Sequence, residues 1–362
     1  MIQWIRPKIW GNEKEHLIKA FDSTWLSAGS YVDLLEEKFG TIHGVKHSIT
    51  TCNGTASIYL ILDALDITFG DSVVVPAFAF GAAANIVSTI GAKPVFCDVD
   101  PETYMLDPKH FEQIVSQKKI KAVIPVHTYG GVCDMNPIIE ISKKYGVHVI
   151  EDVAEAMFSK VDGRFAGTFG LANSFSFQTT KTITTAEGGC ILTNSDELNF
   201  RMRTIRSHGM RDKKYWHYER GNNFRLSNLL ASLGAAQLEY WTDNVSQRDA
   251  LYKKFLAKFG NIDGIKLQKI PSNVSPVMWT FSIYIDPKFS KFNRDEIILK
   301  LKEAGIETRP GFYTFNQMKM YEAPFLPNSD KLAAQIICLP FYLDLSDAEI
   351  DFIYKELLKL KL

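Results

Sequence analysis

One lysine, Lys181, stands in a setting suited to chemistry. It follows the strand-like run SFSF (174–177) and lies among threonines in the segment TTKTITT (179–185). A lysine removed from water loses its proton more easily, and a neutral amine attacks an aldehyde. We therefore predict that Lys181 forms a covalent link to a carbonyl group. The alternative is an ordinary surface lysine in a loop.

An acidic residue, Asp152, ends the largely apolar run VHVIE (147–151). A carboxylate in this position is expected to be partly buried and to need a cationic partner, for which a protonated pyridine nitrogen would serve. The alternative is that Asp152 caps a helix formed by DVAEAM (152–157). The two roles are compatible.

A phosphate site is indicated where Gly54 and Thr55 follow the strand-like run HSITT (47–51) and open a helical segment. The free N–H groups and the positive dipole end of a helix N-terminus attract phosphate. Ser176 precedes Lys181 by a few residues and could offer a hydroxyl to the same phosphate. An ordinary turn and a strand serine are the alternative interpretations.

Two further residues lie near the ends of apolar strands. Phe80 follows Pro76 and could stack on a flat heterocycle or pack in the core. His127 ends the run KAVIPV (121–126), but no second ligand stands at metal spacing. We interpret His127 as a hydrogen-bonded structural or substrate-side residue, and we expect no metal.

These residues belong to a pattern in which short β-branched runs alternate with longer helical segments. The pattern predicts an α/β fold with a doubly wound, mainly parallel sheet, in which ligands bind beyond the carboxyl ends of the strands. The predicted helices begin near Thr55, Phe80, Pro108, Met135 and Asp196. The predicted strands are 47–51, 72–76, 93–99, 121–126, 147–152, 174–177 and 189–193.

From about Asn244 onward the pattern mixes helices with strands such as MWTFSIYI. We therefore predict two domains, a large α/β domain over residues 1–243 and a smaller C-terminal α+β domain over residues 244–362.

The composition narrows the class of protein. Hydrophobic residues make up 46% and charged residues 23%, which is typical of a globular chain. The 41 basic and 41 acidic residues cancel, so binding to nucleic acid or to an anionic membrane is not expected. The five cysteines are odd in number and widely spaced, and the start does not read as a signal peptide. We expect a cytoplasmic protein without disulfides.

Together the motifs resemble those of the DegT/DnrJ/StrS family of sugar aminotransferases, which have the aspartate-aminotransferase fold (fold type I of the pyridoxal 5'-phosphate, or PLP, enzymes). The resemblance runs nearly end to end. It is carried by STWLSAG, NGTASIYLIL, VPAFAFGAAANIV, HTYGGVCDM, IEDVAEA, the Lys181 segment, RGNNFRLSNLLASLGAAQLE, GIETRPGFY and CLPFY.

The resemblance implies roles for the cofactor-side residues. Lys181 would hold PLP as a Schiff base and move protons in both halves of the reaction. Asp152 would pair with the pyridine nitrogen, Glu155 would lie near the ring hydroxyl, and Phe80 would stack on the ring.

The phosphate would be bound by Gly54, Thr55 and Ser176, with Asn223 reaching it from the neighbouring subunit. That last role implies a homodimer with shared active sites. Further residues lie in segments near the sugar nucleotide in relatives, although packing or loop-fixing roles are open: Trp25, Ser27, Arg309 and Tyr313.

The implied substrates are an amino-acid donor, usually glutamate, and a nucleotide-linked keto-sugar. The motifs look most like the GDP-perosamine synthase branch, which acts on GDP-4-keto-6-deoxymannose in surface polysaccharide (O-antigen) biosynthesis. However, Thr314, Asn316 and Lys319 stand where that branch has Pro, His and Pro. A dTDP- or UDP-linked sugar, or an eight-carbon keto-acid sugar, is therefore an alternative acceptor. An alternative of another class is a PLP-binding regulatory protein without turnover.

Overall fold

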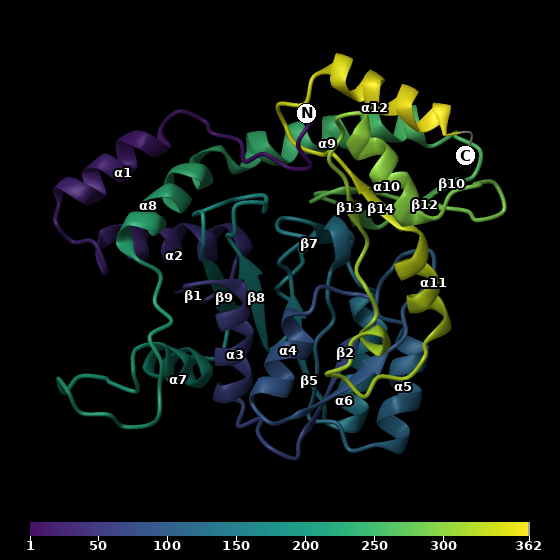
Figure 1. Ribbon diagram of the computed structural model, residues 1–362. Helices are drawn as coiled ribbons and strands as arrows, with labels where there is room; N and C mark the ends of the chain where they lie inside the picture. Colours follow the sequence, from purple (N-terminus) through teal and green to yellow (C-terminus); the bar gives the residue numbers. More distant parts are fainter. Residues whose placement is uncertain (361–362) are drawn as a thin grey trace.

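A seven-stranded sheet forms the centre of the larger part of the molecule in the computed structural model, which describes residues 1–360 (Figure 1). Its strand order is β1-β9-β8-β5-β4-β2-β3, and only β9 runs against its neighbours. The strands are β1 (His47–Thr51), β2 (Ser72–Pro76), β3 (Lys93–Cys97), β4 (Ala122–Val123), β5 (His148–Asp152), β8 (Ala172–Ser176) and β9 (Gly189–Thr193).

Helices cover both faces of this sheet because its strands are apolar on both sides. Along β2, Val73 and Val75 pack with α3 (Gly54–Ala64), α4 (Ala82–Thr89) and α7 (Asp196–Arg206), whereas Val74 packs with α5 (Pro108–Gln117) and α6 (Met135–Tyr145). Along β9, Ile191 joins the first group, and Leu192 packs with α2 (Ser30–His43) and α8 (Asn228–Gln237). Burial on both faces is what a doubly wound sheet requires.

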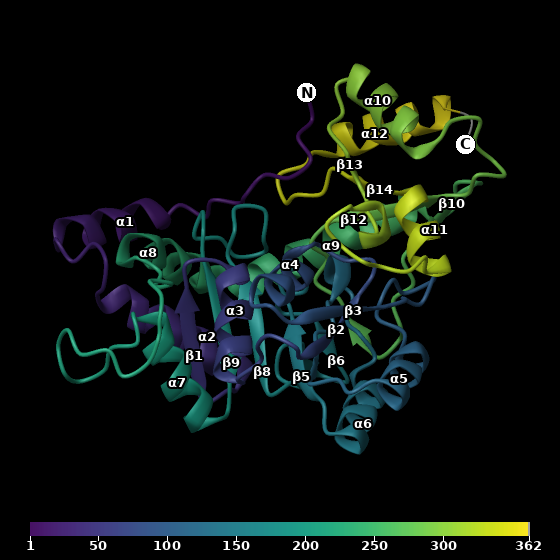
Figure 2. The same ribbon diagram turned by 60° about the horizontal axis from the view of Figure 1, so that its bottom comes forward.

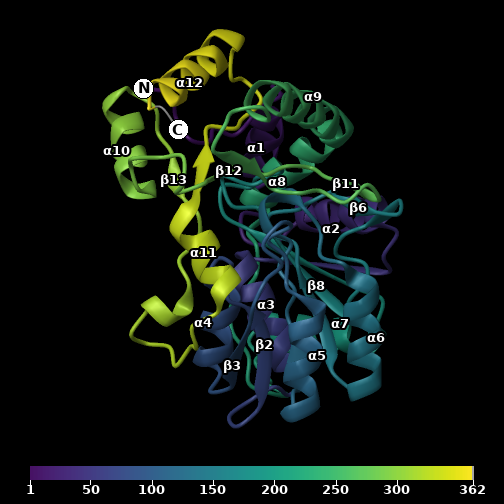
Figure 3. The ribbon, with the colours of Figure 1, turned by 90° about the vertical axis from the view of Figure 1, so that its right-hand side faces the viewer.

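A second, antiparallel sheet of order β10-β12-β14-β13 lies at one end of the larger sheet (Figures 2 and 3). Residue Ile2 joins this region through a parallel bridge to Ile306. Its elements are α9 (Trp241–Phe259), β10 (Ile265–Leu267), β12 (Phe281–Ile285), α10 (Arg294–Glu303), β13 (Arg309–Pro310), α11 (Pro327–Gln335), β14 (Ile336–Leu339) and α12 (Asp347–Lys359).

The remaining elements are short, apart from helix α1 (Glu13–Asp22). They comprise the three-stranded sheet of β6 (Lys160–Val161), β7 (Arg164–Phe165) and β11 (Val274–Ser275), and the 3-10 turns η1 (Thr128–Gly130), η2 (Leu238–Tyr240) and η3 (Phe315–Gln317). Within residues 1–360, no helix combines the length and apolarity needed to cross a membrane.

The predicted fold class is confirmed: a large, mainly parallel doubly wound sheet is accompanied by a smaller α+β region. The five cysteines are free, and all of them except Cys52 are buried. Of the strand predicted over 121–126, Ala122–Val123 forms β4, and Val126 makes an isolated bridge to Asp152. The alternative helix over 152–157 is absent, since that segment forms turns. Helix α9 spans the boundary placed after residue 243, so the division into two domains stays a prediction.

Candidate active site

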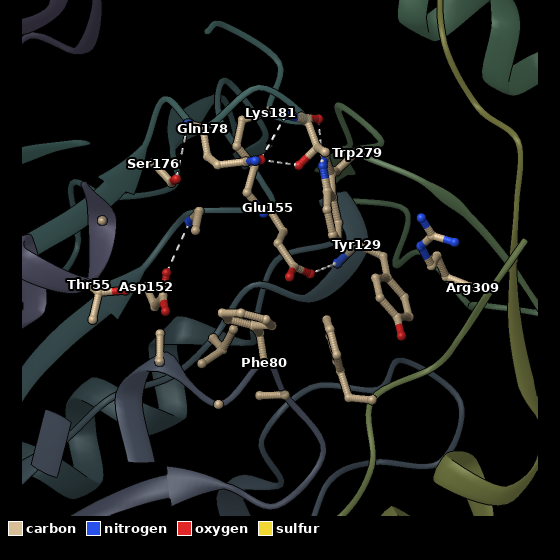
Figure 4. Close-up of a pocket in the computed structure, with 18 of the residues that line it drawn as sticks. Thr55, Phe80, Tyr129, Asp152, Glu155, Ser176, Gln178, Lys181, Trp279 and Arg309 are labelled. Carbon is tan, nitrogen blue, oxygen red and sulfur yellow. Dashed lines mark hydrogen bonds between the residues drawn. The ribbon is translucent and has the colours of Figure 1, made fainter. Parts of the chain in front are cut away.

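A cavity of about 770 Å³ opens where the carboxyl ends of the parallel strands face the C-terminal region (Figure 4). Phe80 comes from the loop after β2, Asp152 from the end of β5, and Ser176 from the end of β8. Most of the predicted site residues line it: Gly54, Thr55, Phe80, Asp152, Glu155, Ser176, Lys181, Arg309 and Tyr313.

The centre of the cavity combines one amine with two buried carboxyl groups. Asp152 and Glu155 are 6% and 3% exposed. Burial raises the pKa of Asp152, and it raises the pKa of Glu155 to about 7. Burial lowers the pKa of the Lys181 amine, an effect that the charges of Glu155 and Asp152 oppose. The amine therefore gives up its proton more readily than a surface lysine does.

Tight turns supply the hydrogen bonds that these acids receive from the chain. The N–H of Ala154 donates to Oδ1 of Asp152 at 3.0 Å, so Asp152 closes a turn rather than capping a helix. The N–H of Tyr129 donates to Oε2 of Glu155 at 3.0 Å. Tyr129 has φ +62°, a left-handed conformation that directs this amide into the cavity. Within residues 1–360, Asp152 has no ion-pair partner, which leaves room for a cationic ligand group.

The start of α3 forms a polar cradle beside Ser176. The Asn53 side chain accepts the N–H of Ala56 and caps the helix, whereas the N–H groups of Gly54 and Thr55 make no hydrogen bond within the described part of the chain. A Cβ atom on Gly54 would lie 3.1 Å from the Cβ of Ser176, so glycine allows the helix to approach β8 closely. Free amides, a helix dipole and a hydroxyl meet here, as a phosphate would require.

Aromatic side chains form further parts of the cavity wall. Phe80 is 63% exposed and faces the cavity, which rules out the alternative of core packing. Trp279 is 7% exposed, and its ring lies under the amine of Lys181, with 3.7 Å between Nζ and the ring centre. Trp4 and Tyr129 also line the cavity. Trp4, Tyr129 and Trp279 were not predicted, because nothing in their local sequence places them at this cavity.

Several candidate residues lie outside the cavity of a single chain. Trp25, Ser27 and Asn223 are exposed and do not line it. His127 is fully buried; its Nε2 lies 2.9 Å from Glu151 Oε2, and its Nδ1 accepts the N–H of Cys133. His127 therefore has the structural rather than the substrate-side role. Within residues 1–360, no cluster of potential metal ligands occurs.

Comparison with known proteins places this geometry in a family. The model of the DegT/DnrJ/EryC1/StrS aminotransferase family matches residues 7–358. The chain belongs to this family. It is 37% identical to GDP-perosamine synthase of Escherichia coli O157:H7, with 96% of this chain and 95% of the relative covered. It is 36% identical to GDP-perosamine synthase of Caulobacter vibrioides, with 95% and 94% covered.

A solved structure extends the similarity in three dimensions. The PLP form of the putative sugar aminotransferase Spr1654 from Streptococcus pneumoniae has a TM-score of 0.91 over 99% of this chain and 97% of its own, at 24% identity, and so shares the fold. As a member of this family, the chain is a PLP-dependent sugar aminotransferase.

The cavity fits PLP in three respects that can be read from the chain itself. The amides at the start of α3 and Ser176 could hold the phosphate, and buried Asp152 could face the pyridine nitrogen. Lys181, with its lowered pKa, is the amine available to the aldehyde. When bound, PLP supplies an electron sink for the bonds at the amino carbon of the donor.

Replacing Glu155 with Gln should change how the stability of the apoprotein depends on pH. Because burial raises the pKa of Glu155 from 4.5 to about 7, the folded protein keeps a proton that the unfolded chain releases. Relative to Glu155→Gln, the wild-type unfolding free energy should therefore fall by about 3 kcal/mol as the pH rises from about 4.5 to 7. Other groups, such as His43, whose pKa burial lowers to about 4, affect both proteins alike. Urea titrations at several pH values measure the difference. Glu187→Gln changes an exposed acid of the same cavity and should show the same dependence of unfolding free energy on pH as wild type. The same pH dependence in all three proteins would contradict a raised pKa of Glu155.

Proposed function

We propose that the chain transfers an amino group from L-glutamate to GDP-4-keto-6-deoxymannose and so produces GDP-perosamine for a surface polysaccharide. The observation that carries the proposal is the meeting of Lys181, Asp152 and Glu155 in one cavity of about 770 Å³. The likeness to two GDP-perosamine synthases at 36% and 37% identity supports the choice of acceptor.

In this proposal each residue has a task set by its surroundings. The N–H groups of Gly54 and Thr55 and the hydroxyl of Ser176 bind the phosphate, and Phe80 stacks on the ring. Asp152 holds a proton on the pyridine nitrogen, since a buried carboxylate favours a neighbouring positive charge.

Lys181 moves the reacting proton. Its Nζ accepts a proton from the amino carbon of the donor and delivers it in the second half of the reaction, when the amino group passes to the keto-sugar. Arg309 is, apart from Lys181, the cationic side chain among the described residues that line the cavity. We assign it to the anionic groups of the substrates.

The loop after β13 bears on the choice of sugar, because it departs from the perosamine pattern at Thr314, Asn316 and Lys319. Thr314 is 2% exposed, and its hydroxyl donates to Asp330 Oδ1 at 2.8 Å. The Nδ2 of Asn316 donates to the same oxygen at 3.0 Å. Lys319 is exposed and does not line the cavity. The loop presents other side chains to the cavity, namely Phe312, Tyr313 and Met318.

The departures therefore lie behind the surface that a sugar would touch. Thr314 and Asn316 fasten the loop to Asp330 at the start of α11, and they leave the cavity wall to Tyr313 and Met318. This placement supports retention of the perosamine-type acceptor.

A homodimer is part of the proposal. Trp25, Ser27 and Asn223 are exposed and outside the cavity. The Nδ2 of Asn228, at the start of α8, donates a hydrogen bond of 2.7 Å to the carbonyl oxygen of Trp25. Apolar side chains at and beyond α1 are also exposed, namely Leu17, Ile18, Phe21, Trp25 and Leu26. An exposed apolar patch of this kind favours contact with a second copy, which would carry Asn223 to the partner's phosphate site.

Replacing Lys181 with Ala should abolish both the coloured PLP adduct and amine transfer. The wild-type protein supplied with PLP should show a near-ultraviolet or visible band that borohydride traps on Lys181 and that glutamate bleaches. Lys160→Ala, at a lysine outside the cavity, should retain both properties. A wild-type band that glutamate does not change would instead favour a PLP-binding protein without turnover, and transfer by Lys181→Ala would refute the role of this amine.

The acceptor can be identified by product analysis with GDP-, dTDP- and UDP-linked keto-sugars and an eight-carbon keto-acid sugar. We expect kcat/KM to be highest for GDP-4-keto-6-deoxymannose. Thr314→Pro combined with Asn316→His should leave the ranking unchanged, whereas Met318→Ala should lower kcat/KM for the preferred sugar about tenfold through lost contact. Preference for another sugar would refute the acceptor assignment while leaving amine transfer intact.

Mixed subunits test the shared site. Lys181→Ala and Asn223→Ala proteins should each have low activity, and a refolded equimolar mixture should regain about a quarter of wild-type activity, because half the dimers are mixed and each mixed dimer has one intact site. Mixing Lys181→Ala with Asp152→Ala should restore nothing, since both changes fall in the same cavity. Absence of recovery in the first mixture would contradict the contribution of Asn223 from a neighbouring subunit.

A further inference from the structure

The amine of Lys181 has an aromatic ring as its nearest partner. Its Nζ lies 3.7 Å from the centre of the Trp279 ring (Figure 4). Among the described residues, no hydrogen bond or ion pair joins this amine to an oxygen atom. The charged groups that act on it are Glu155 and Asp152, both at or just beyond the end of β5, and neither forms an ion pair with it.

Contacts on several sides fix the Trp279 ring. Its Nε1 donates to the carbonyl of Thr180, the residue before Lys181, at 2.8 Å. Its backbone N–H donates to the carbonyl of Tyr129 at 3.0 Å. The edge of Trp4 meets the ring at 85°, with 5.5 Å between ring centres. Trp279 is only 7% exposed, so the ring cannot turn away without disrupting its neighbours.

A ring held in this way affects the two protonation states of the amine differently. An ammonium ion over an indole face is attracted by the ring quadrupole, most strongly when water is excluded, whereas a neutral amine gains little. The cavity otherwise disfavours the cation, because burial lowers the pKa of Lys181. Trp279 thus opposes the effect of desolvation on the Lys181 ammonium ion, which has no ion-pair partner among the described residues.

We propose that Trp279 is a positioning residue for Lys181: its fixed indole face stabilises the ammonium form of the amine once the amine has left the cofactor and accepted a proton. The proposal rests on the proposed function, in which Lys181 must carry a proton between the two substrates. It adds a residue of the C-terminal region to the proton-handling part of the site.

The test measures the basicity of Lys181 in the apoprotein, without turnover. Reductive methylation with formaldehyde and cyanoborohydride modifies neutral amines, and peptide mass spectrometry reports the extent at Lys181 across a pH series. Trp279→Met keeps apolar bulk without a ring face, and it should move the midpoint of labelling down by about one pH unit, so that labelling below both midpoints is about tenfold faster. Trp279→Phe keeps a weaker ring face and should move the midpoint in the same direction by less.

Trp241→Met is the matched control, since Trp241 packs against Phe158 and Phe165 and does not line the cavity. Its midpoint should equal that of wild type. Formation of the PLP band shows that a variant is folded. If Trp279→Met does not form the band, the midpoint of Lys181 labelling in Trp279→Phe decides the test. An unchanged or raised midpoint in a folded Trp279 variant would overturn the inference. Failure of wild-type protein to form the band would instead overturn the proposed function.

Discussion

Asp152 and Glu155 have their carboxyl groups buried beside the amine of Lys181, and the other features of the site follow from this desolvation. A buried acid is tolerated only where hydrogen bonds or an opposite charge replace the lost water. The chain provides one amide to each acid, from Ala154 and from Tyr129, and both amides come from tight turns. Among the described residues neither acid has a second hydrogen-bond donor, so each can still accept a hydrogen bond from a bound ligand.

Two neighbouring acids of β5, Glu151 and Asp152, have different roles. Glu151 is fully buried and accepts the N–H groups of Gly167, Phe169 and Gly170 at 2.6 to 2.8 Å. Because Nδ1 of His127 accepts an amide proton, its Nε2 carries the proton that is donated to Glu151. Since successive side chains of a strand point to opposite faces, Glu151 anchors the loop that leads into β8, whereas Asp152 faces the cavity.

The sequence predicts the part of the site that depends on strand ends. Asp152, Ser176 and Lys181 could be grouped because each follows a strand-like run and the carboxyl ends of parallel strands share one edge. Trp4 and Trp279 could not be found, since their positions depend on packing between distant segments. The alternative prediction of a helix over 152–157 was wrong. The residue composition does not reveal that the Asp152 side chain closes a turn there. Ala186 has φ +67°, a left-handed conformation that glycine adopts more readily and that an alanine in the sequence does not indicate.

Trp4, which lines the cavity, is anchored through its backbone N–H to Glu307, 303 positions along the chain, and its ring lies beneath the guanidinium of Arg309. The cavity wall thus joins the two ends of the described chain, while Lys181 lies in the middle of the sequence. A deletion that removes Trp4 would therefore alter the wall of the binding site, although Trp4 is far from Lys181 along the chain.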